Sequence, residues 1–259
     1  MTERTIHSVE EFIEAVHEDS DSWPAEQPRW FRGEPVSEQA LLPTLYRRGL
    51  AHRENALLQM FRARAPGFHD AVPHRDHTDQ WLFLARHAGL PTRLLDWSEG
   101  ALFGLHFALK EGGKPAVVWM LNPLQLFWFA LGQPADPDPG DLREFPLPWV
   151  QRDPPNENPA FENIRGAWEH DEPGVPLPVP VYPTYVHPRL RAQRACFTIH
   201  GKRKEGLNLL VPDSILKCYQ VDPAFHPSML NDLALLGVTD SVAFPDLDGL
   251  ANELKNRLS

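Results

Sequence analysis

Arg32 is the residue of this sequence best suited to bind a phosphate group. It ends a short stretch, residues 29–32, that predicts a strand, and Gly33 follows it directly. An arginine at the end of a strand commonly points into a cleft, and its guanidinium can donate two parallel hydrogen bonds to a phosphate. The alternative is a structural ion pair beside a glycine turn. Both interpretations stay open, and Arg32 and Gly33 are candidate site residues.

A second group of polar residues lies in the strand expected over residues 92–97. Side chains alternate along a strand, so Arg93 and Asp96 should point to opposite faces and serve different partners. Asp96 or Ser98 can instead cap the helix that follows, because the sequence there fits a capping-box pattern. Trp97 shares the face of Arg93, where it either packs in the core or forms an aromatic wall for a planar ligand.

Two histidines lie on expected helices close to these residues. His87 comes near the end of one helix, where a donor or a cation stabilises the free carbonyl groups. It also stands next to a loop, which keeps it a candidate catalytic residue. His106 lies inside an almost entirely apolar helix, and we expect it to be a hydrogen-bonded core residue.

Other catalytic signatures are missing from the sequence. His74 and His77 are three residues apart but have no third ligand in a suitable context, so no metal site is expected. There is no Gly-rich phosphate loop followed by Lys and Ser or Thr, and no Gly-x-Ser-x-Gly motif. Neither Cys196 nor Cys218 has neighbours that mark it as a nucleophile.

The spacing of apolar residues predicts the elements that position these side chains. Expected helices cover residues 9–18, 54–65, 79–88, 99–109, 123–131, 188–193 and 224–236, and a last helix starts at Leu247. Expected strands cover residues 29–32, 92–97, 116–121, 196–200, 215–221 and 241–244. The continuous apolar run over residues 116–121 is typical of an interior strand. The pattern as a whole predicts an α/β protein.

The stretch of residues 134–183 has a different character. It holds about half of the chain's 27 prolines and many acidic residues, so it cannot be mostly helix or central strand. It also carries Trp149, Phe161 and Trp168, which suit a lid or a patch that binds a protein partner. We expect a Pro-rich surface insertion with one helical piece at residues 161–168.

The composition is that of a globular protein with a full hydrophobic core. The 259 residues are 42% hydrophobic and 23% charged, and we expect one domain over residues 1–259. The net charge of −10 argues against non-specific binding of nucleic acid or of an anionic membrane. There are only two cysteines, no signal-peptide pattern at the start and no apolar run long enough to span a bilayer. A soluble, cytoplasmic protein is expected.

Four motifs, in order along the chain, resemble those of the FRG domain family. They fall over roughly residues 29–252. The first is Trp30-Phe31-Arg32-Gly33 with Leu42-Pro43-Thr44-Leu45 and Arg47, the second is LARHAGLPTRLLDWS over residues 84–98, the third is Pro188-Arg189-Leu190 with Gln193 and Phe197-Thr198-Ile199, and the fourth runs from Gly237 to Leu250. The family usually carries Gln, a second His or aromatic residue, and Gly where this chain has Arg86, Ala88 and Ala195.

The order of these motifs is similar to that of ADP-ribosyltransferases. The resemblance implies an α+β or mixed α/β fold in which helices surround a central split or mixed β-sheet. It also implies that Arg32 anchors NAD, that the corner from Asp96 to Ser98 flanks the nicotinamide, and that Gln193 faces the reacting ribose.

Gln193 limits the chemistry that this resemblance implies. Cleavage of the glycosidic bond of NAD builds positive charge on the ribose carbon. A glutamine can hydrogen-bond a ribose hydroxyl, but it can neither act as a general base nor supply a negative charge. A helix-end hydrogen bond is the alternative role of Gln193. The neighbouring Arg189 either binds phosphate together with Arg191 or is simply solvated.

The function expected from this resemblance is an ADP-ribosyltransferase-like enzyme that uses NAD, as a bacterial toxin or phage-defence effector would. Such an enzyme modifies a macromolecule or hydrolyses the dinucleotide. The candidate catalytic residues are Arg32, Gln193 and His87, and the candidate ligand-binding residues are Gly33, Arg93, Asp96, Trp97, Ser98 and Arg189. The alternative is a non-catalytic module that binds a nucleotide or a protein partner through the same cleft.

Overall fold

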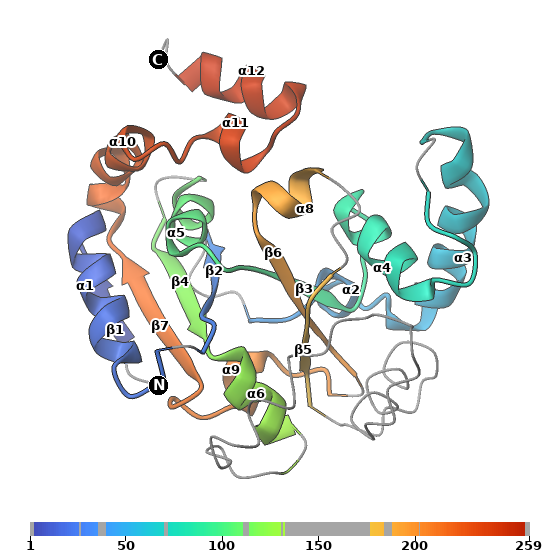
Figure 1. The fold of residues 1–259 in the computed structure, drawn as a ribbon, viewed down its shortest axis with the longest axis horizontal. Coiled ribbons are helices and arrows are strands. Elements are labelled where there is room, and N and C mark those ends of the chain that lie inside the picture. Colours follow the sequence, from blue (N-terminus) through green and yellow to red (C-terminus); the bar gives the residue numbers. More distant parts are fainter. Residues whose placement is uncertain are drawn as a thin grey trace.

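A seven-stranded mixed β-sheet with helices on both faces forms the centre of this computed structural model (Figure 1). The structure describes residues 3–25, 27–35, 40–69, 72–110, 114–130, 132, 177–183, 188–201 and 203–256. The strands are β1 (Glu3–Ile6), β2 (Trp30–Glu34), β3 (Leu94–Ser98), β4 (Ala116–Leu121), β5 (Val179–Val181), β6 (Ala195–Ile199) and β7 (Leu216–Val221). Their order across the sheet is β1-β7-β4-β2-β3-β6-β5. Only the β1–β7 pair among them is parallel, so the expected mixed α/β architecture is confirmed.

Helices connect and cover these strands. The described α-helices are α1 (Val9–Ser20), α2 (Thr44–Arg47), α3 (Glu54–Arg64), α4 (Thr78–His87), α5 (Ala101–Leu109), α6 (Pro123–Ala130), α8 (Pro188–Ala192), α9 (Leu207–Leu210), α10 (His226–Leu235), α11 (Asp240–Ala243) and α12 (Leu247–Asn256). Short 3-10 turns occur at η1 (Ala51–Arg53), η2 (Ala65–Gly67) and η4 (Pro223–Phe225). None of the helices described has the length and apolar character that a membrane span requires.

The interior strand β4 is buried on both faces, as its continuous apolar sequence predicts. Val118 and Met120 point into a core shared with α1, α5 and α10. Trp119 and Leu121 point to the opposite side, into a core shared with α4 and α6. The sheet therefore separates two hydrophobic layers, and polar groups that line a ligand site must lie where one of these layers is interrupted.

A close helix–strand contact fixes β2. A Cβ built on Gly33 would lie 2.1 Å from the carbonyl oxygen of Gly104 and 2.3 Å from the amide nitrogen of Ala108, both on α5. Only a residue without a side chain allows this approach. The glycine that follows Arg32 therefore lets α5 lie against β2, and this contact holds the arginine at a fixed place.

Most expected elements are present within two or three residues of their predicted ends, but one is of the wrong type. Residues 241–244, expected as a strand, belong mainly to the one-turn helix α11. Apolar runs of this length do not distinguish a strand from a buried helical turn. The amide and hydroxyl groups of Ser241 contact the Glu253 carboxylate of α12, and this contact favours the helical turn.

One end of the Pro-rich stretch belongs to the sheet. The strand β5 pairs with β6, and Val179 and Val181 are fully buried. Pro180 is tolerated because β5 lies at the edge of the sheet. The prediction of a surface insertion is thus wrong for these residues. Trp149, the helix expected at residues 161–168 and the rest of that stretch up to residue 176 lie outside the described residues.

Candidate functional site

A cleft of about 340 Å³ lies where β2, β3 and β6 meet the ends of α4, α5 and α8. A volume of this size suits part of a nucleotide or another small ligand. The residues that line it are Phe31, Arg32, Gly33, Arg86, His87, Gly89, Asp96, Trp97, Ser98, Phe107, Leu190, Gln193, Ala195, Phe197 and Phe244. Seven of the nine residues predicted from the sequence are among them.

Arg32 lies on the floor of the cleft and is held from two sides. Its Nε donates a hydrogen bond of 2.7 Å to Oε1 of Glu34, and its Nη2 lies 2.7 Å from the same oxygen. Its Nη1 donates a 2.8 Å hydrogen bond to the backbone carbonyl of Asp96. The structural ion pair considered for Arg32 is therefore present, and only 12% of the side chain is exposed.

The contact between Arg32 and the Asp96 carbonyl takes the place of a backbone hydrogen bond between β2 and β3. β2 and β3 are paired at one position, where Phe31 lies opposite Ser98. If the antiparallel ladder continued, Asp96 would face Gly33 and its carbonyl would accept a backbone hydrogen bond from β2. The Arg32 guanidinium takes that bond instead. Its place in the cleft is thus a consequence of the short pairing between these two strands.

Arg86, on the last turn of α4, forms a second ion pair in the cleft. Its Nε lies 3.0 Å and 2.9 Å from the two carboxylate oxygens of Asp96, and its Nη2 also contacts Oδ2. Burial alone would raise the pKa of Asp96, but the nearby Arg86 and Arg32 guanidiniums outweigh it and hold that pKa below its ordinary value. A carboxylate that stays ionised, with 40% of its side chain exposed, therefore faces the cleft.

Asp96 consequently does not cap the helix that follows it. The hydroxyl oxygen of Ser98 accepts a 3.0 Å hydrogen bond from the backbone N–H of Gly100, next to the start of α5. The same hydroxyl donates a 2.7 Å hydrogen bond to the carbonyl of Gln193. Neither of the two capping residues considered caps α5, whose N-cap is Gly100 without a side-chain hydrogen bond; Ser98 instead ties β3 to the segment that precedes β6.

The charges around the cleft floor leave a positive surplus. Desolvation lowers the pKa of Arg47, which is also coupled to the charges of Glu34, Arg32, Arg86 and Asp96. These five groups comprise three guanidiniums and two carboxylates. Of these, Arg32, Arg86 and Asp96 line the cleft itself, two guanidiniums and one carboxylate, in a chain whose net charge is −10. An anionic group such as a phosphate is the ligand that such a surplus favours.

Gln193 reaches the cleft from the end of α8. Its side-chain Nε2 donates a 2.8 Å hydrogen bond to the carbonyl of Ala243, the last residue of α11. The helix-end hydrogen bond considered for this glutamine is therefore made to α11 rather than to its own helix. Since the amide nitrogen is engaged, the amide oxygen is the atom that can accept a hydrogen bond from a ligand.

Aromatic side chains form another wall of the cleft. Phe107 of α5 and Phe244 lie edge to face, with their ring centroids 5.7 Å apart. Lys110 Nζ lies 4.1 Å from the centroid of the Phe244 ring. Trp97, the aromatic residue predicted from the sequence, is buried and donates a 3.1 Å hydrogen bond to the Thr198 hydroxyl. Core packing explains most of the Trp97 side chain.

Two of the predicted ligand-binding residues are not placed in the cleft. Arg93 is buried, with its backbone N–H and its Nε on the two carboxylate oxygens of Glu54 at 3.1 and 2.7 Å. Arg93 and Asp96 indeed have different partners, as strand alternation predicts. The side chain of Arg189 lies outside the described residues. His106, buried in α5, lies 3.3 Å from Asp240 and is a core residue, as expected.

Sequence reasoning missed three lining residues that matter for the chemistry. Arg86 was noted only as a departure from a family pattern, and Phe107 and Phe244 were not singled out. Arg86 lies near the end of an expected helix and Asp96 lies ten residues later in the strand that follows. This arrangement is only a weak signal that the two side chains meet. No local signal links Phe107 to Phe244. Among the described residues, no group of three His, Cys, Asp or Glu side chains is arranged to hold a metal ion.

Comparison with known proteins gives one match. Residues 27–116 match the model of the FRG domain, and this stretch contains Arg32, Arg86, His87 and Asp96. Gln193 and Phe244 lie beyond it. No match was found among curated proteins or among solved structures.

Proposed function

We propose that this chain, whose residues 27–116 belong to the FRG domain family, binds NAD in the cleft and cleaves its nicotinamide–ribose bond, as ADP-ribosyltransferases do. The ADP-ribosyl group passes to a macromolecule or to water. The observation that carries the proposal is that Arg32, Asp96 and Gln193 come from three separate elements and line one cleft.

The positive surplus at the cleft floor supports the binding of a pyrophosphate. Arg32 and Arg86 are both held by carboxylates, so neither has to lose much conformational freedom when a ligand arrives. A diphosphate would then lie against guanidiniums that are already in place. This arrangement gives electrostatic stabilisation together with little reorganisation.

The phenylalanine pair supports the binding of a planar ring. Phe107 and Phe244 present apolar ring surface to the cleft next to the charged floor. Nicotinamide is a planar cation while it is attached to ribose, and aromatic faces and edges accommodate such groups. We assign the nicotinamide to this wall.

Asp96 supplies the negative charge that Gln193 cannot. When the C1′–N bond breaks, its electron pair goes to the nicotinamide nitrogen, and positive charge is left on the ribose carbon. The ionised Asp96 carboxylate can stabilise that charge, whereas its lowered pKa makes it a weak proton acceptor. The Gln193 amide oxygen accepts a hydrogen bond from a ribose hydroxyl. An acceptor hydroxyl or water then bonds to C1′ and releases its proton to the solvent.

The test combines calorimetry with a nicotinamide-release assay on the purified protein. Asp96→Asn should leave NAD binding within a few-fold and lower turnover by about 100-fold or more, because the charge matters mostly in the transition state. Arg86→Gln should weaken NAD binding. Arg203→Gln is the matched control, because Arg203 is exposed, lies outside the cleft lining and pairs with the neighbouring Glu205. Turnover that is unchanged in Asp96→Asn would falsify the assignment.

The second candidate function is a non-catalytic nucleotide-binding module. One observation favours it: the Arg32 and Arg86 guanidiniums are already paired with Glu34 and Asp96, as in a structural network. In this case NAD and ADP-ribose would bind equally well, and no nicotinamide would be released at any enzyme concentration. The same two measurements therefore distinguish the two functions.

A further inference from the structure

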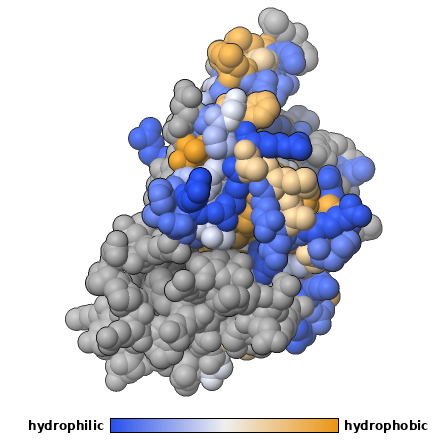
Figure 2. Space-filling model, turned by 90° about the vertical axis from the view of Figure 1, so that its right-hand side faces the viewer, coloured by the Kyte–Doolittle hydropathy of each residue, from blue (hydrophilic) through white to orange (hydrophobic). Residues whose placement is uncertain are grey.

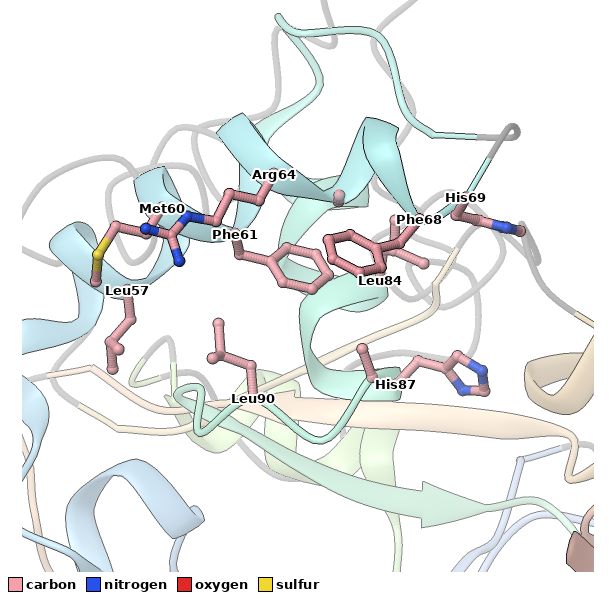
Figure 3. A pocket seen from close by; sticks show the side chains of 11 residues that line it. Leu57, Met60, Phe61, Arg64, Phe68, His69, Leu84, His87 and Leu90 are labelled. Carbon is pink, nitrogen blue, oxygen red and sulfur yellow. The ribbon is translucent and has the colours of Figure 1, made fainter.

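An apolar groove separate from the cleft lies between α3 and the end of α4, with a volume of about 660 Å³. Its lining is shown in Figure 3, with side chains from α3 on one side and from α4 and the following loop on the other. The apolar side chains are Leu57, Met60, Phe61, Ala65, Phe68, Leu84, Ala88 and Leu90. Phe68 is 91% exposed and Met60 is 49% exposed. Such exposure of large apolar side chains in one place marks an interaction surface.

The groove is rimmed by basic side chains. Arg64, His69 and His87 line it together with the apolar residues. In the space-filling view of this side of the molecule, apolar side chains lie among strongly hydrophilic ones (Figure 2). The surrounding segment, residues 44–93, contains eight arginines and four acidic residues, although the chain as a whole is acidic. A partner for this groove should therefore be apolar along one side and acidic beside it.

The C-terminal helix α12 has this chemistry. Leu247, Leu250 and Leu254 follow one another at intervals of three and four residues, so they form one stripe on the helix. All three are exposed, Leu247 by 83%. The other side of α12 faces α11, where Gly249 is buried against Phe244. The apolar stripe thus has no cover within the described part of the chain.

The acidic groups of α12 lie next to its stripe. Asp246 and Asp248 are exposed at the start of the helix and flank Leu247. An amphipathic helix that places an apolar stripe in a hydrophobic groove is a common mode of protein recognition. The basic rim of the groove and the acidic start of α12 are complementary in charge, which favours one orientation of such a contact.

We propose that the α12 leucine stripe of one molecule docks into the α3–α4 groove of a second copy of this chain. The contact must be intermolecular, because α12 lies above α10 and α11 at one end of the molecule and α3 lies at its right-hand edge (Figure 1). The two surfaces differ, so the interface is head to tail. Such an interface leads to a ring or to an open chain of copies.

A single contact between α12 and the α3–α4 groove would bury two apolar side chains that are unusually exposed in the monomer. Phe68 on the groove side and Leu247 on the helix side would both leave the solvent. His87 lines the groove and also the cleft, so the helix of one copy would end beside the candidate site of the next. The inference does not depend on what the cleft binds, because the self-association is measured without any nucleotide.

The test is sedimentation equilibrium of the full chain at about 100 μM, where an interface with a Kd of about 1 μM is largely occupied. Wild type should self-associate. Met60→Glu in the groove and Leu250→Glu on α12 should each sediment as a monomer, since both residues are exposed and the changes should not affect folding. Leu209→Glu, which alters an exposed leucine outside both surfaces, is the matched control and should behave like wild type.

A mixture of the two variants gives the sharper result. Met60→Glu keeps an intact α12 and Leu250→Glu keeps an intact groove, so the mixture should form a one-to-one dimer and nothing larger. Two monomeric variants that fail to pair would overturn the head-to-tail contact. Wild type that is monomeric would overturn the proposal as well. If that monomer binds an anionic fluorescent dye such as anilinonaphthalene sulfonate and Met60→Glu loses the dye, the groove is a small-molecule site instead.

Discussion

The guanidinium of Arg86 contacts both carboxylate oxygens of Asp96, with Nε 3.0 Å from Oδ1 and 2.9 Å from Oδ2. This pair joins the last turn of α4 to the middle of β3. It fixes a carboxylate in the lining of the cleft and keeps it ionised. The stability of the fold and the chemistry of the cleft therefore depend on the same contact.

Arg86→Gln should lower the free energy of unfolding by about 1 kcal/mol, a modest value because Asp96 is 40% exposed. The folded-state pKa of Asp96 is depressed, so the stabilisation is present above the unfolded pKa of about 4 and is lost as the pH falls through the folded value. Urea unfolding of both proteins at pH 7 and pH 3 checks this. The difference in stability should shrink at the lower pH; a constant difference would contradict the role of the carboxylate charge.

Arg93→Met should destabilise the protein much more strongly, by about 3–5 kcal/mol. The Arg93 Nη2 lies 2.6 Å from Oε2 of Glu54, and both side chains are almost fully buried. Removal of the arginine leaves an uncompensated carboxylate in the core. Chemical denaturation measures the loss, and the double variant with Glu54→Gln should recover part of it. A single variant as stable as wild type would show that the pair contributes nothing.

Gly33→Ala should lower the melting temperature markedly, whereas Gly67→Ala should not. A Cβ at Gly33 would lie 2.1 Å from a backbone oxygen of α5, while nothing lies within 4 Å of the corresponding position at Gly67. Overpacking of this kind costs about 1–3 kcal/mol or more, since backbone atoms have to move. Thermal unfolding followed by circular dichroism compares the two. Equal melting temperatures would mean that α5 can move away from β2 at little cost.

His200 should make the protein sensitive to mild acid. This histidine is fully buried, and burial together with the nearby charge of Arg32 lowers its pKa to about 3. Its stabilising contribution is complete above the unfolded pKa of about 6.5 and is lost as the pH falls from there towards 3. Between pH 6.5 and pH 5 the loss amounts to at most about 2 kcal/mol. Urea unfolding of His200→Gln should show a flatter pH dependence than wild type over this interval.

Much of the scaffold could be predicted because its signals are local. β4 is apolar throughout and α5 is apolar apart from His106, and this pattern predicted two elements that are buried or half-buried along their whole length. Ser8 followed three residues later by Glu11 is a capping-box pattern, and the Ser8 hydroxyl accepts a 3.0 Å hydrogen bond from the backbone N–H of Glu11. Strand alternation correctly gave Arg93 and Asp96 different partners.

The rest depends on contacts between residues far apart in the chain. β5 forms a strand because it can pair with the edge of β6 that β3 leaves unpaired, and nothing in the Pro-rich sequence of β5 indicates this. The partner of Asp96 comes from a preceding helix whose angle to β3 is set by packing. The pairing of Phe107 with Phe244 joins segments more than 130 residues apart, a separation that no local pattern can bridge.

The short pairing of β2 with β3 has a consequence for the size of the folding unit. The family match stops at Ala116, the first residue of β4. Within residues 27–116, β2 and β3 share a single paired position. Their long ladders are made to β4 and β6, which lie almost wholly outside that segment. Residues 27–116 produced alone should therefore remain largely unfolded, and the autonomous unit must extend at least through β7 on the other side of β4.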